Sequence, residues 1–408
     1  MTSSLATAQR SLADPAVRHP LWPPLTAGCP VTSTDEVAYP LDVDYDYARV
    51  PAGLFTDPLP PGAAHGLDRW APLLPPLASP GLGEGGTPLV RLADGVYVKD
   101  ESRNPTWSHK DRLNRVAVGA AKAAGAQGIA VSSSGNHGAS AAAYAARAGL
   151  PCVVFASPYA PPAVASFVRA YGAAVLTVPF EATRSLMRRM VTELGYQPVS
   201  NLTDSAHTGH PFGPEGYKTL AYELFLDLGR VPAAVYLPTG YGELLFGVTK
   251  GFRELVTLGL ADSVPRVYAC EPAARGPLAA AVRTGRPAAH VEFAPTDAYA
   301  IGCTVGSYRG VVALRDSGGA ALTVTDEQMA AARDELAAQG LWYELSSAAG
   351  LAALRAHGSA ADADGPVVCV ATSSGFKDLA TARRDVAHEL MAGDWDSVLT
   401  ALKAAGHA

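Results

Sequence analysis

The sequence predicts an α/β fold made of two lobes, each built on a parallel sheet, with an irregular N-terminal arm. Short apolar runs alternate with helix-like segments from about residue 85 onward, and this alternation is typical of the β-α-β crossovers that build a parallel sheet. The alternation comes in two series, one before and one after residue 205. Residues 1–80 instead contain many prolines and no sustained periodicity. Because proline blocks helix interiors and central strands, we expect an extended arm on the folded core.

Each element of the first series is an apolar run or an alanine-rich segment. Alanine-rich segments favour helices, and short apolar runs between turn residues favour buried strands. We expect strands at residues 96–99, 128–132, 152–156 and 174–178, and helices at residues 111–126, 137–148, 161–171 and 181–194.

The second series repeats this pattern. Thr325 and Gln328 are spaced as in a capping box, which marks the start of a helix. Parallel sheets bind ligands at the carboxyl ends of their strands, so the loops that follow the strands are where we expect chemistry. We expect helices at residues 215–228, 243–258 and 326–338, and strands at residues 233–237, 266–270 and 367–371.

The composition excludes several classes of protein. The chain has 408 residues, of which 48% are hydrophobic and 17% charged, enough apolar material for a sizeable core. Its formal net charge of −6 argues against a nucleic-acid partner. We find no apolar run of about 18 residues that could span a membrane, and no secretory signal in the first 30 residues. We therefore expect a cytoplasmic protein with no membrane partner.

The cysteines do not form a disulfide framework or a zinc site. Their number is odd, they are scattered, and no C-x-x-C pair occurs, so we expect no metal. Cys152, Cys270 and Cys369 lie in strand-like apolar runs. We expect these to be buried free thiols that behave as small hydrophobic residues.

Small and glycine residues follow three of the predicted strands, at residues 132–138, 238–243 and 371–377. Backbone N–H groups of such loops can converge on an anion, and a following helix N-terminus adds a favourable field. Leu245 interrupts the dinucleotide-binding pattern G-x-G-x-x-G after the second strand. Each loop, taken alone, is also explained by a tight turn with a helix cap.

Lys110 lies in N-P-T-W-S-H-K-D-R, residues 104–112, at the start of a predicted helix. The helix dipole disfavours a cation at this end. A partly buried lysine there would have a lowered pKa and be a better amine nucleophile. Taken alone, a solvated lysine in a charged run is the simpler interpretation.

Together these motifs resemble the fold-type II pyridoxal-phosphate enzymes (the tryptophan synthase β-like superfamily), and within them the threonine synthases. The resemblance covers about residues 82–380, and the motifs stand in the family's order. The segments that carry it are G-E-G-G-T-P-L at 83–89, N-P-T-W-S-H-K-D-R at 104–112 (similar to N-P-T-G-S-F-K-D-R), S-S-G-N-H-G at 133–138, E-G-Y-K-T at 215–219 (similar to E-G-Q-K-T), the turn and helix at 238–252, E-L-S-S-A at 344–348 (similar to E-P-S-S-A) and T-S-S-G-F-K-D at 372–378 (similar to T-G-H-G-L-K-D).

The resemblance implies pyridoxal 5′-phosphate as the cofactor and Lys110 as the catalytic residue, which forms the Schiff base and takes the substrate α-proton. It implies that Asn136 binds the cofactor's ring hydroxyl and that Thr372 faces the pyridine nitrogen. A hydroxyl partner there suits prompt loss of a leaving group. The residues implied to wrap the cofactor phosphate are Gly240, Tyr241, Gly242, Glu243 and Leu244. Those implied to bind a small amino-acid substrate are Ser133, Ser134, His137, Thr106, Trp107, His207 and Thr208.

The resemblance also implies a division of the chain. We expect an N-terminal arm of residues 1–80, a large PLP-binding lobe of residues 81–111 and 206–390, a small α/β lobe of residues 112–205 and a C-terminal tail of residues 391–408. Fold-type II relatives are commonly dimers, so the resemblance implies a homodimer.

Some positions depart from the threonine synthase pattern. The asparagine, serine and arginine with which threonine synthases read the substrate phosphate correspond here to His207, Thr208 and Gly213, and arginine is the usual bidentate phosphate anchor. Tyr241 and Glu243 replace glycines of the cofactor turn, where a carboxylate is unfavourable unless it points away or caps the helix. We therefore expect an enzyme that is not specific for O-phosphohomoserine.

The leading hypothesis is a PLP-dependent threonine synthase-like lyase that performs elimination or replacement at the β or γ carbon of an amino acid. The alternative within the family is a threonine/serine dehydratase-like ammonia-lyase, for which S-G-N-H-G at 134–138 is typical. An alternative of another class is a PLP-binding pseudoenzyme, which the altered turn at Tyr241 and Glu243 suggests. Lys110 and Asn136 are both present, which favours an enzyme.

Overall fold

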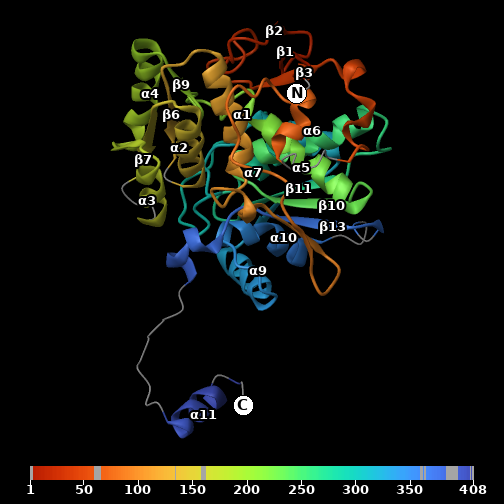
Figure 1. Ribbon diagram of the computed structural model, residues 1–408, viewed down its shortest axis with the longest axis vertical. Helices are drawn as coiled ribbons and strands as arrows, with labels where there is room; N and C mark the ends of the chain where they lie inside the picture. Colours follow the sequence, from red (N-terminus) through yellow and green to blue (C-terminus); the bar gives the residue numbers. More distant parts are fainter. Residues whose placement is uncertain are drawn as a thin grey trace. The chain divides into compact units, whose positions relative to one another are not determined.

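A six-stranded sheet is the largest sheet of the protein, for which we have a computed structural model (Figure 1). Its strands lie in the order β12-β11-β10-β13-β5-β4, and all neighbours are parallel except β4 and β5. They are β4 (Leu89–Arg91), β5 (Tyr97–Asp100), β10 (Ala234–Pro238), β11 (Arg266–Pro272), β12 (Ala321–Val324) and β13 (Val367–Ala371).

A second parallel sheet is formed by the chain between the first and last strands of the six-stranded sheet. It has the order β8-β7-β6-β9, and every neighbouring pair is parallel. Its strands are β6 (Gly128–Ser132), β7 (Cys152–Ala156), β8 (Ala174–Thr177) and β9 (Tyr196–Pro198). The fold is therefore α/β with two parallel sheets, as the alternation in the sequence predicts.

The structure describes residues 3–58, 66–133, 135–157, 162–358, 362, 364–382, 394–404 and 406. The chain divides into two units, residues 1–378 and residues 379–408. Helices cover the sheets (Figure 1). The α-helices are α1 (Lys110–Ala123), α2 (Asn136–Ala148), α3 (Pro162–Ala170), α4 (Phe180–Leu194), α5 (Gly213–Leu228), α6 (Glu243–Thr257), α7 (Pro277–Thr284), α8 (Tyr308–Ser317), α9 (Asp326–Ala338), α10 (Ala349–His357) and α11 (Trp395–Ala404). The short 3-10 helices are η1 (Tyr47–Arg49), η2 (Ala52–Leu54), η3 (Leu67–Leu73), η4 (Glu101–Arg103), η5 (Leu345–Ala348), η7 (Gly375–Lys377) and η8 (Leu379–Ala382).

The largest hydrophobic core joins the two sheets through α1, α2, α5 and α6. Helix α5 packs against α6 and α1, and α1 packs against α2. Small residues allow this close approach: a Cβ at Gly247 or Gly251 of α6 would come within 2.7 Å of α5. Cys152, Cys270 and Cys369 are buried in β7, β11 and β13 as free thiols, as expected.

Several elements agree with the prediction to the residue, and others were not predicted. Strands β6, β7 and β13 and helix α9 have the predicted bounds, and Thr325 and Gln328 form the predicted capping box. The sequence analysis did not predict β4, β9, β12, α7, α8 or α10. The missed strands contain three or four residues each, which is too short for a periodic signal.

The N-terminal arm is more regular than we expected. It contains a three-stranded antiparallel sheet of β1 (Ala6–Ser11), β2 (Arg18–Pro20) and β3 (Leu41–Tyr45), in the order β2-β1-β3. The prolines do not prevent this sheet, because Pro20 ends an edge strand, where its missing N–H costs no ladder hydrogen bond. The central strand, β1, contains no proline.

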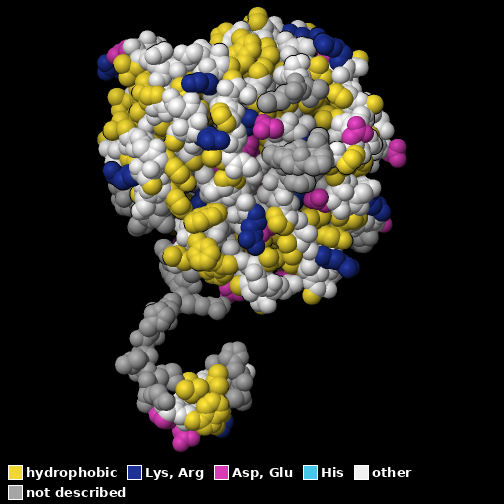
Figure 2. All heavy atoms as spheres, in the orientation of Figure 1, with side chains coloured by type: hydrophobic (Ala, Val, Ile, Leu, Met, Phe, Trp, Pro, Cys, Tyr) yellow, Lys and Arg dark blue, Asp and Glu magenta, His cyan; other side chains and the backbone are white. Residues whose placement is uncertain are grey.

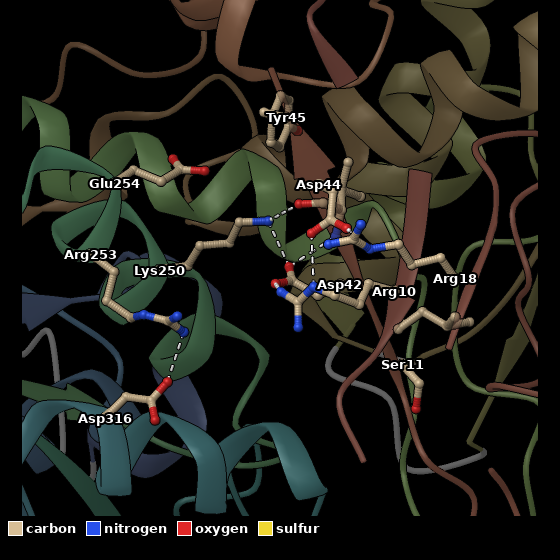
Figure 3. Close-up of polar contacts among 12 residues, drawn as sticks. Arg10, Ser11, Arg18, Asp42, Asp44, Tyr45, Lys250, Arg253, Glu254 and Asp316 are labelled. Atoms are coloured by element: carbon tan, nitrogen blue, oxygen red, sulfur yellow. Dashed lines mark hydrogen bonds and ion pairs between the residues drawn. The ribbon is translucent and has the colours of Figure 1, made fainter. Parts of the chain in front are cut away.

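A network of buried charges joins the arm to α5 and α6 (Figure 3). The Lys250 amine of α6 lies 2.6 Å from Asp42 of β3 and 2.8 Å from Glu215 of α5. On the arm, Arg10 of β1 pairs with Asp42 at 2.8 Å. On the helix side, Lys218 pairs with Glu215 at 2.7 Å. Because each of these buried charges has an opposite charge within ion-pair distance, the arm is held in one position on the helices.

The second unit consists of η8, α11 and the residues around them. Trp395 of α11 is 68% exposed, and the hydrophobic side chains of this helix lie together on its surface in Figure 2. Within the described residues, no helix is both long enough and apolar enough to cross a membrane.

Candidate active site

A cavity of about 740 Å³ lies at the carboxyl ends of strands from both parallel sheets. Its lining includes residues that follow β6, β7, β10 and β13, which is where parallel sheets place their ligands. The volume is that of a site for a cofactor or small molecule. The predicted site residues among its lining are Lys110, Ser133, Asn136, His137, His207, Gly240, Tyr241, Gly242, Glu243, Leu244 and Thr372.

The start of α1 is fixed beside the loop that follows β13. Strands β5 and β13 are neighbours in the sheet, and Ser108 and Ser373 continue their contact as an isolated bridge. The backbone N–H of His109 donates to the carbonyl oxygen of Thr372 at 2.9 Å. Lys110, the first residue of α1, is thereby positioned next to Thr372 in the cavity wall.

The Lys110 amine has an environment that favours its neutral form. Desolvation by the surrounding protein lowers the pKa of Lys110, although Glu243, Cys303 and Glu344 oppose the shift. The same burial and the nearby Lys110 charge hold the pKa of His109 well below its usual range. Within the described residues, Lys110 forms no ion pair with a carboxylate. The lowered pKa makes the neutral amine more accessible than in an exposed lysine, and therefore makes Lys110 a better nucleophile and base.

The turn between β10 and α6 presents backbone N–H groups to the cavity. Gly242 is the N-cap of α6, with φ +83°, and a Cβ there would lie 3.0 Å from Gly310. A Cβ at Gly240 would lie 2.9 Å from the Cys303 sulfur. At Gly242 glycine is therefore favoured by both the backbone conformation and the close packing, and at Gly240 by the close packing alone. The first N–H groups of α6 have no partner within the helix, and the helix dipole favours an anion at this end.

Glu243, the first residue of α6, turns toward His207 and does not cap the helix. Its Oε2 lies 3.2 Å from Nε2 of His207, and the His207 ring stacks on Tyr241 with centroids 3.8 Å apart. Burial would raise the pKa of Glu243, but the hydrogen bond and charge of His207, with Lys110 and Arg309, lower it to about 2. The carboxylate therefore carries its negative charge at neutral pH.

Asn136, the first residue of α2, is held by three side chains. Its Nδ2 donates to both oxygens of Glu344 at 3.1 Å, and its Oδ1 accepts from Lys377 at 2.8 Å and from Ser373 at 3.1 Å. Burial raises the pKa of Glu344 to about 7, against the opposing effects of Asn136 and Lys377. Burial likewise lowers the pKa of Lys377 to about 8, against Glu344. The Asn136 amide is thus fixed in orientation at the cavity wall.

Thr372 faces the same cavity from the end of β13. Its hydroxyl lies 2.9 Å from the hydroxyl of Ser347, and either can be the donor. The Ser347 hydroxyl also accepts from the Ser373 backbone N–H at 2.9 Å. This part of the wall therefore offers a neutral, adjustable hydrogen-bond partner.

Three predicted substrate residues are absent from the lining of the cavity, and a fourth is not described. Thr106 is buried, and its backbone N–H donates to Asp111 at 2.6 Å. Trp107 is 43% exposed, with φ +62°, and packs on Phe167. The backbone N–H of Thr208 donates to Oδ1 of Asn201 at 3.0 Å. Ser134 lies outside the described residues.

The cavity also contains residues that the sequence analysis did not select. They come from α4, from the loop after β9 and from the long segments around α7, where no local pattern marks them. Arg184 and Arg275 add guanidinium groups to the lining, and Cys303 adds a thiol. Other residues in this group include Thr183, Ser200, Asn201, Phe293, Tyr299 and Ile301. Within the described residues, no group of three or more His, Cys, Asp or Glu side chains is arranged to hold a metal ion.

Curated relatives share the sequence over most of its length. The threonine synthase of Methanosarcina acetivorans is 34% identical over 376 residues, which are 85% of this chain and 89% of that protein. The threonine synthase of Mycobacterium leprae is 34% identical over 346 residues, which are 81% of this chain and 89% of that protein.

Solved structures share the fold. Maize serine racemase superposes with a TM-score of 0.61 at 20% identity, over 79% of this chain and 94% of that one. A fungal L-serine ammonia-lyase from Rhizomucor miehei superposes with a TM-score of 0.61 at 22% identity, over 71% of this chain and 94% of that one. The family described as pyridoxal-phosphate dependent enzyme matches residues 81–373, the part of the chain that forms both parallel sheets and the cavity. The chain therefore belongs to the family of pyridoxal-phosphate-dependent enzymes.

Proposed function

We propose that this chain is a threonine synthase-like lyase that performs elimination or replacement at the β or γ carbon of a small amino acid. The observation that carries this proposal is the position of Lys110, at a helix start in a cavity that also contains an anion-binding turn. The relatives named threonine synthase, 34% identical over most of the chain, support it.

The residues of the cavity fit pyridoxal phosphate, the cofactor of the family. Gly240 and Gly242 leave backbone N–H groups open to a phosphate group at the start of α6. Asn136 and Thr372 line the same cavity as Lys110 and would face a group held there. The buried Nε2 of His137 has no hydrogen-bond partner within the described residues, and a bound group can supply one.

Lys110 has two roles in this proposal. Its amine would hold the cofactor, and the same amine, when free, would take the proton from the substrate α carbon. When bound, pyridoxal phosphate supplies the electron sink that stabilises the resulting negative charge. Thr372, with Ser347, gives the cofactor ring nitrogen a neutral partner. This favours loss of a leaving group over transamination.

The substrate carboxylate is assigned to the loop at the start of α2. Ser133 and His137 line the cavity there, and the N-terminus of α2 favours a negative charge. Asn136 is held in place by Glu344 and Lys377. We propose that Ser133, Asn136 and His137 hold the carboxylate so that the α carbon faces Lys110.

The far end of the substrate meets a different set of residues from that of threonine synthases. Gly213 replaces the arginine of the threonine synthase pattern, and a Cβ there would already lie 3.0 Å from Leu113. Arg184 and Arg275 supply guanidinium groups elsewhere on the cavity wall. We therefore propose an enzyme that is not specific for O-phosphohomoserine.

The remaining features of the proposal concern the assembly. We propose a cytoplasmic homodimer, with a large cofactor-binding lobe of residues 81–111 and 206–390 and a small lobe of residues 112–205. Size-exclusion chromatography with light scattering measures the number of subunits directly.

An amino-acid panel tests the proposed reaction. The purified enzyme with cofactor is given phosphorylated and unphosphorylated homoserine, serine and threonine, and both phosphate and α-keto acid are measured. Phosphate release with formation of a new hydroxy amino acid supports the synthase-like reaction. Keto acid from threonine or serine, without phosphate release from any substrate, would instead identify a dehydratase-like ammonia-lyase. A bound cofactor with no product from any substrate would identify a pseudoenzyme.

A further inference from the structure

We propose that Glu243 and His207 form a proton-linked part of the phosphate site: a phosphate group that binds the turn before α6 brings one proton onto His207. Glu243 then holds the resulting imidazolium beside the phosphate. This inference rests on the proposed position of the cofactor phosphate at residues 240–244. It concerns how this chain tolerates a carboxylate where an anion must bind.

The geometry makes Glu243 and His207 a fixed pair. One carboxylate oxygen of Glu243 lies 3.2 Å from His207 Nε2. The other, Oε1, is buried, faces Gly209, and has no hydrogen-bond partner within the described residues. His207 cannot turn away easily, because it is buried and its ring lies flat on Tyr241, with an interplanar angle of 6°. The pair therefore stays next to the turn in any ligand state that keeps this packing.

The charges around the pair leave it with one net negative charge at neutral pH. Burial lowers the pKa of His207, with Glu243 opposing and Arg309 and Lys110 adding to the effect, so the imidazole is neutral. The low pKa of Glu243 keeps the carboxylate ionised. The other titratable groups that act on the pair are His137 of α2, His210, Tyr217 of α5, and Tyr241.

Arg309 of α8 does not remove this negative charge. Its Nη1 donates to the carbonyl oxygen of Thr208 at 2.9 Å, and its Nη2 donates to that of Leu41 at 2.5 Å. These bonds fix the guanidinium, which acts on Glu243 through space and forms no ion pair with it within the described residues. A phosphate dianion at the turn would consequently meet the Glu243 carboxylate as a like charge in a poorly solvated site.

Protonation of His207 offsets the repulsion between the phosphate and the Glu243 carboxylate. The pair then carries no net charge, and the imidazolium lies between two anions, each of which raises its pKa. Binding is therefore linked to the uptake of one proton between the lowered pKa of free His207 and its raised pKa in the complex. Within that window the affinity for phosphate rises up to about tenfold for each unit that the pH falls. Above and below the window the affinity no longer depends on this proton.

Calorimetry on the full chain stripped of cofactor tests the inference. The probe is pyridoxine 5′-phosphate, which has the ring and the phosphate but no aldehyde to react with Lys110. Titrations between pH 7 and 8.5 keep the probe's phosphate a dianion, because phosphate esters lose their second proton at about pH 6. Repeating each titration in two buffers of different ionisation enthalpy gives the number of protons taken up. We expect close to one proton at the lower end of this range.

Two variants and a control separate this linkage from a structural role. In Glu243→Gln the repulsion is gone, so at pH 8.5 we expect binding on the order of tenfold tighter than in the wild type and a flat pH dependence. In His207→Asn we expect weaker binding and no proton uptake. Glu327→Gln removes an exposed carboxylate from the first turn of another helix, α9, and should match the wild type. Thermal unfolding confirms that each variant is folded before it is titrated.

The possible results distinguish this inference from the proposed function. If the wild type takes up no proton, or if Glu243→Gln binds more weakly at pH 8.5, the linkage is wrong. If pyridoxal phosphate itself still binds with its visible absorbance in that case, the cofactor site stands and only the role of the pair is overturned. If neither the probe nor pyridoxal phosphate binds, the proposed cofactor position has failed, and the linkage fails with it.

Discussion

The arm network and the cavity wall both bury charged side chains on α6, but they satisfy them differently. In the middle of the helix, Lys250 has Asp42 and Glu215 within 2.8 Å, and the Val43 carbonyl oxygen accepts from the same amine at 2.6 Å. At the N-terminal end, Glu243 has one oxygen on His207 and one with no partner within the described residues. Fully paired charges hold elements in position, whereas an incompletely paired charge beside a ligand site can respond to the ligand, for example through a change of protonation in its partner.

This difference gives the two regions opposite energetic roles. Breaking a buried pair leaves an uncompensated charge and costs stability. Removing a strained charge from a ligand site relieves a desolvation cost and can stabilise the protein while it harms function. The predictions that follow use this contrast, from the largest expected effect to the smallest.

Replacing Lys110 should have the largest effect, and on activity alone. In Lys110→Ala we expect turnover to fall by roughly a thousandfold or more, because the nucleophile and the base are lost together. The visible absorbance of the bound cofactor should disappear as well. Stability should change little, since the amine has no ion-pair partner within the described residues. Lys122→Ala, in the last turn of the same helix, is the matched control, and an equal loss of turnover in that variant would refute the assignment.

Replacing Lys250 should have the largest effect on stability. Lys250→Met keeps the length of the side chain but removes the cation that Asp42 and Glu215 share, which leaves Asp42 only the partly exposed Arg10 and Glu215 only Lys218. We expect the free energy of unfolding to fall by about 3–5 kcal/mol, measured by urea denaturation. A loss below about 1 kcal/mol would mean that the arm is not held by this pair and would remove the contrast between the two regions.

Replacing Glu344 should raise the free energy of unfolding at pH 8, whereas replacing Lys250 should lower it. Its pKa is about 7 in the folded chain, against about 4.3 in an unfolded one. The folded state therefore binds this proton more tightly, and the stability it contributes at low pH is lost as the pH rises through 7. In Glu344→Gln we expect the free energy of unfolding at pH 8 to rise by about 1–3 kcal/mol, with little difference from wild type near pH 4.

A control for Glu344 comes from an exposed carboxylate of α9. Glu335 pairs with Arg355 at 2.6 Å, and both side chains are more than one-third exposed. Glu335→Gln should leave the pH dependence of unfolding as in the wild type. If Glu344→Gln is instead less stable than the wild type at pH 8, the cavity wall is a stabilising network like that of the arm.

The smallest effect is expected at an exposed ion pair on α6. Arg253 pairs with Asp316 at 2.7 Å, and its side chain is 47% exposed. Figure 3 shows this pair beside the buried network around Lys250. In Arg253→Met we expect a change of at most about 1 kcal/mol in the free energy of unfolding. Because the helix and the type of substitution are the same as for Lys250→Met, the difference between the two variants isolates the effect of burial.

The parts of the fold that the sequence predicts are those with a strong local signal. Val131, Cys369 and their neighbours form short apolar runs between turn residues, and β6, β7 and β13 have the predicted bounds. The capping box at Thr325 and Gln328 marks the start of α9 correctly. By contrast, the arm sheet was missed, because β1 and β3 pair across a segment of the chain with no regular pattern. Pairing between distant segments is a tertiary property that local periodicity does not carry.

The same division holds for the site. Lys110, Asn136 and the turn at Gly240 and Gly242 were identified from local motifs, and the structure places them around one cavity. Arg184 and Arg275 were missed, because each lies in a segment with no motif and reaches the cavity only through the packing of the chain. Thr208 was predicted from its position in the threonine synthase pattern, but its hydroxyl donates to Oδ1 of Asn201 and it does not line the cavity.

The sequence by itself determined the fold class, the family and the lysine on which the proposed chemistry depends. These rest on the order of strands and helices and on motifs whose residues are close in the chain. Only the tertiary structure decided how the charges are arranged: that Asp42 of the arm meets Lys250, and that Glu243 turns away from its helix axis toward His207. The first two residues are 208 positions apart in the sequence, and the second two are 36 positions apart. They come together because buried charges are stable only beside an opposite charge or a hydrogen-bond partner.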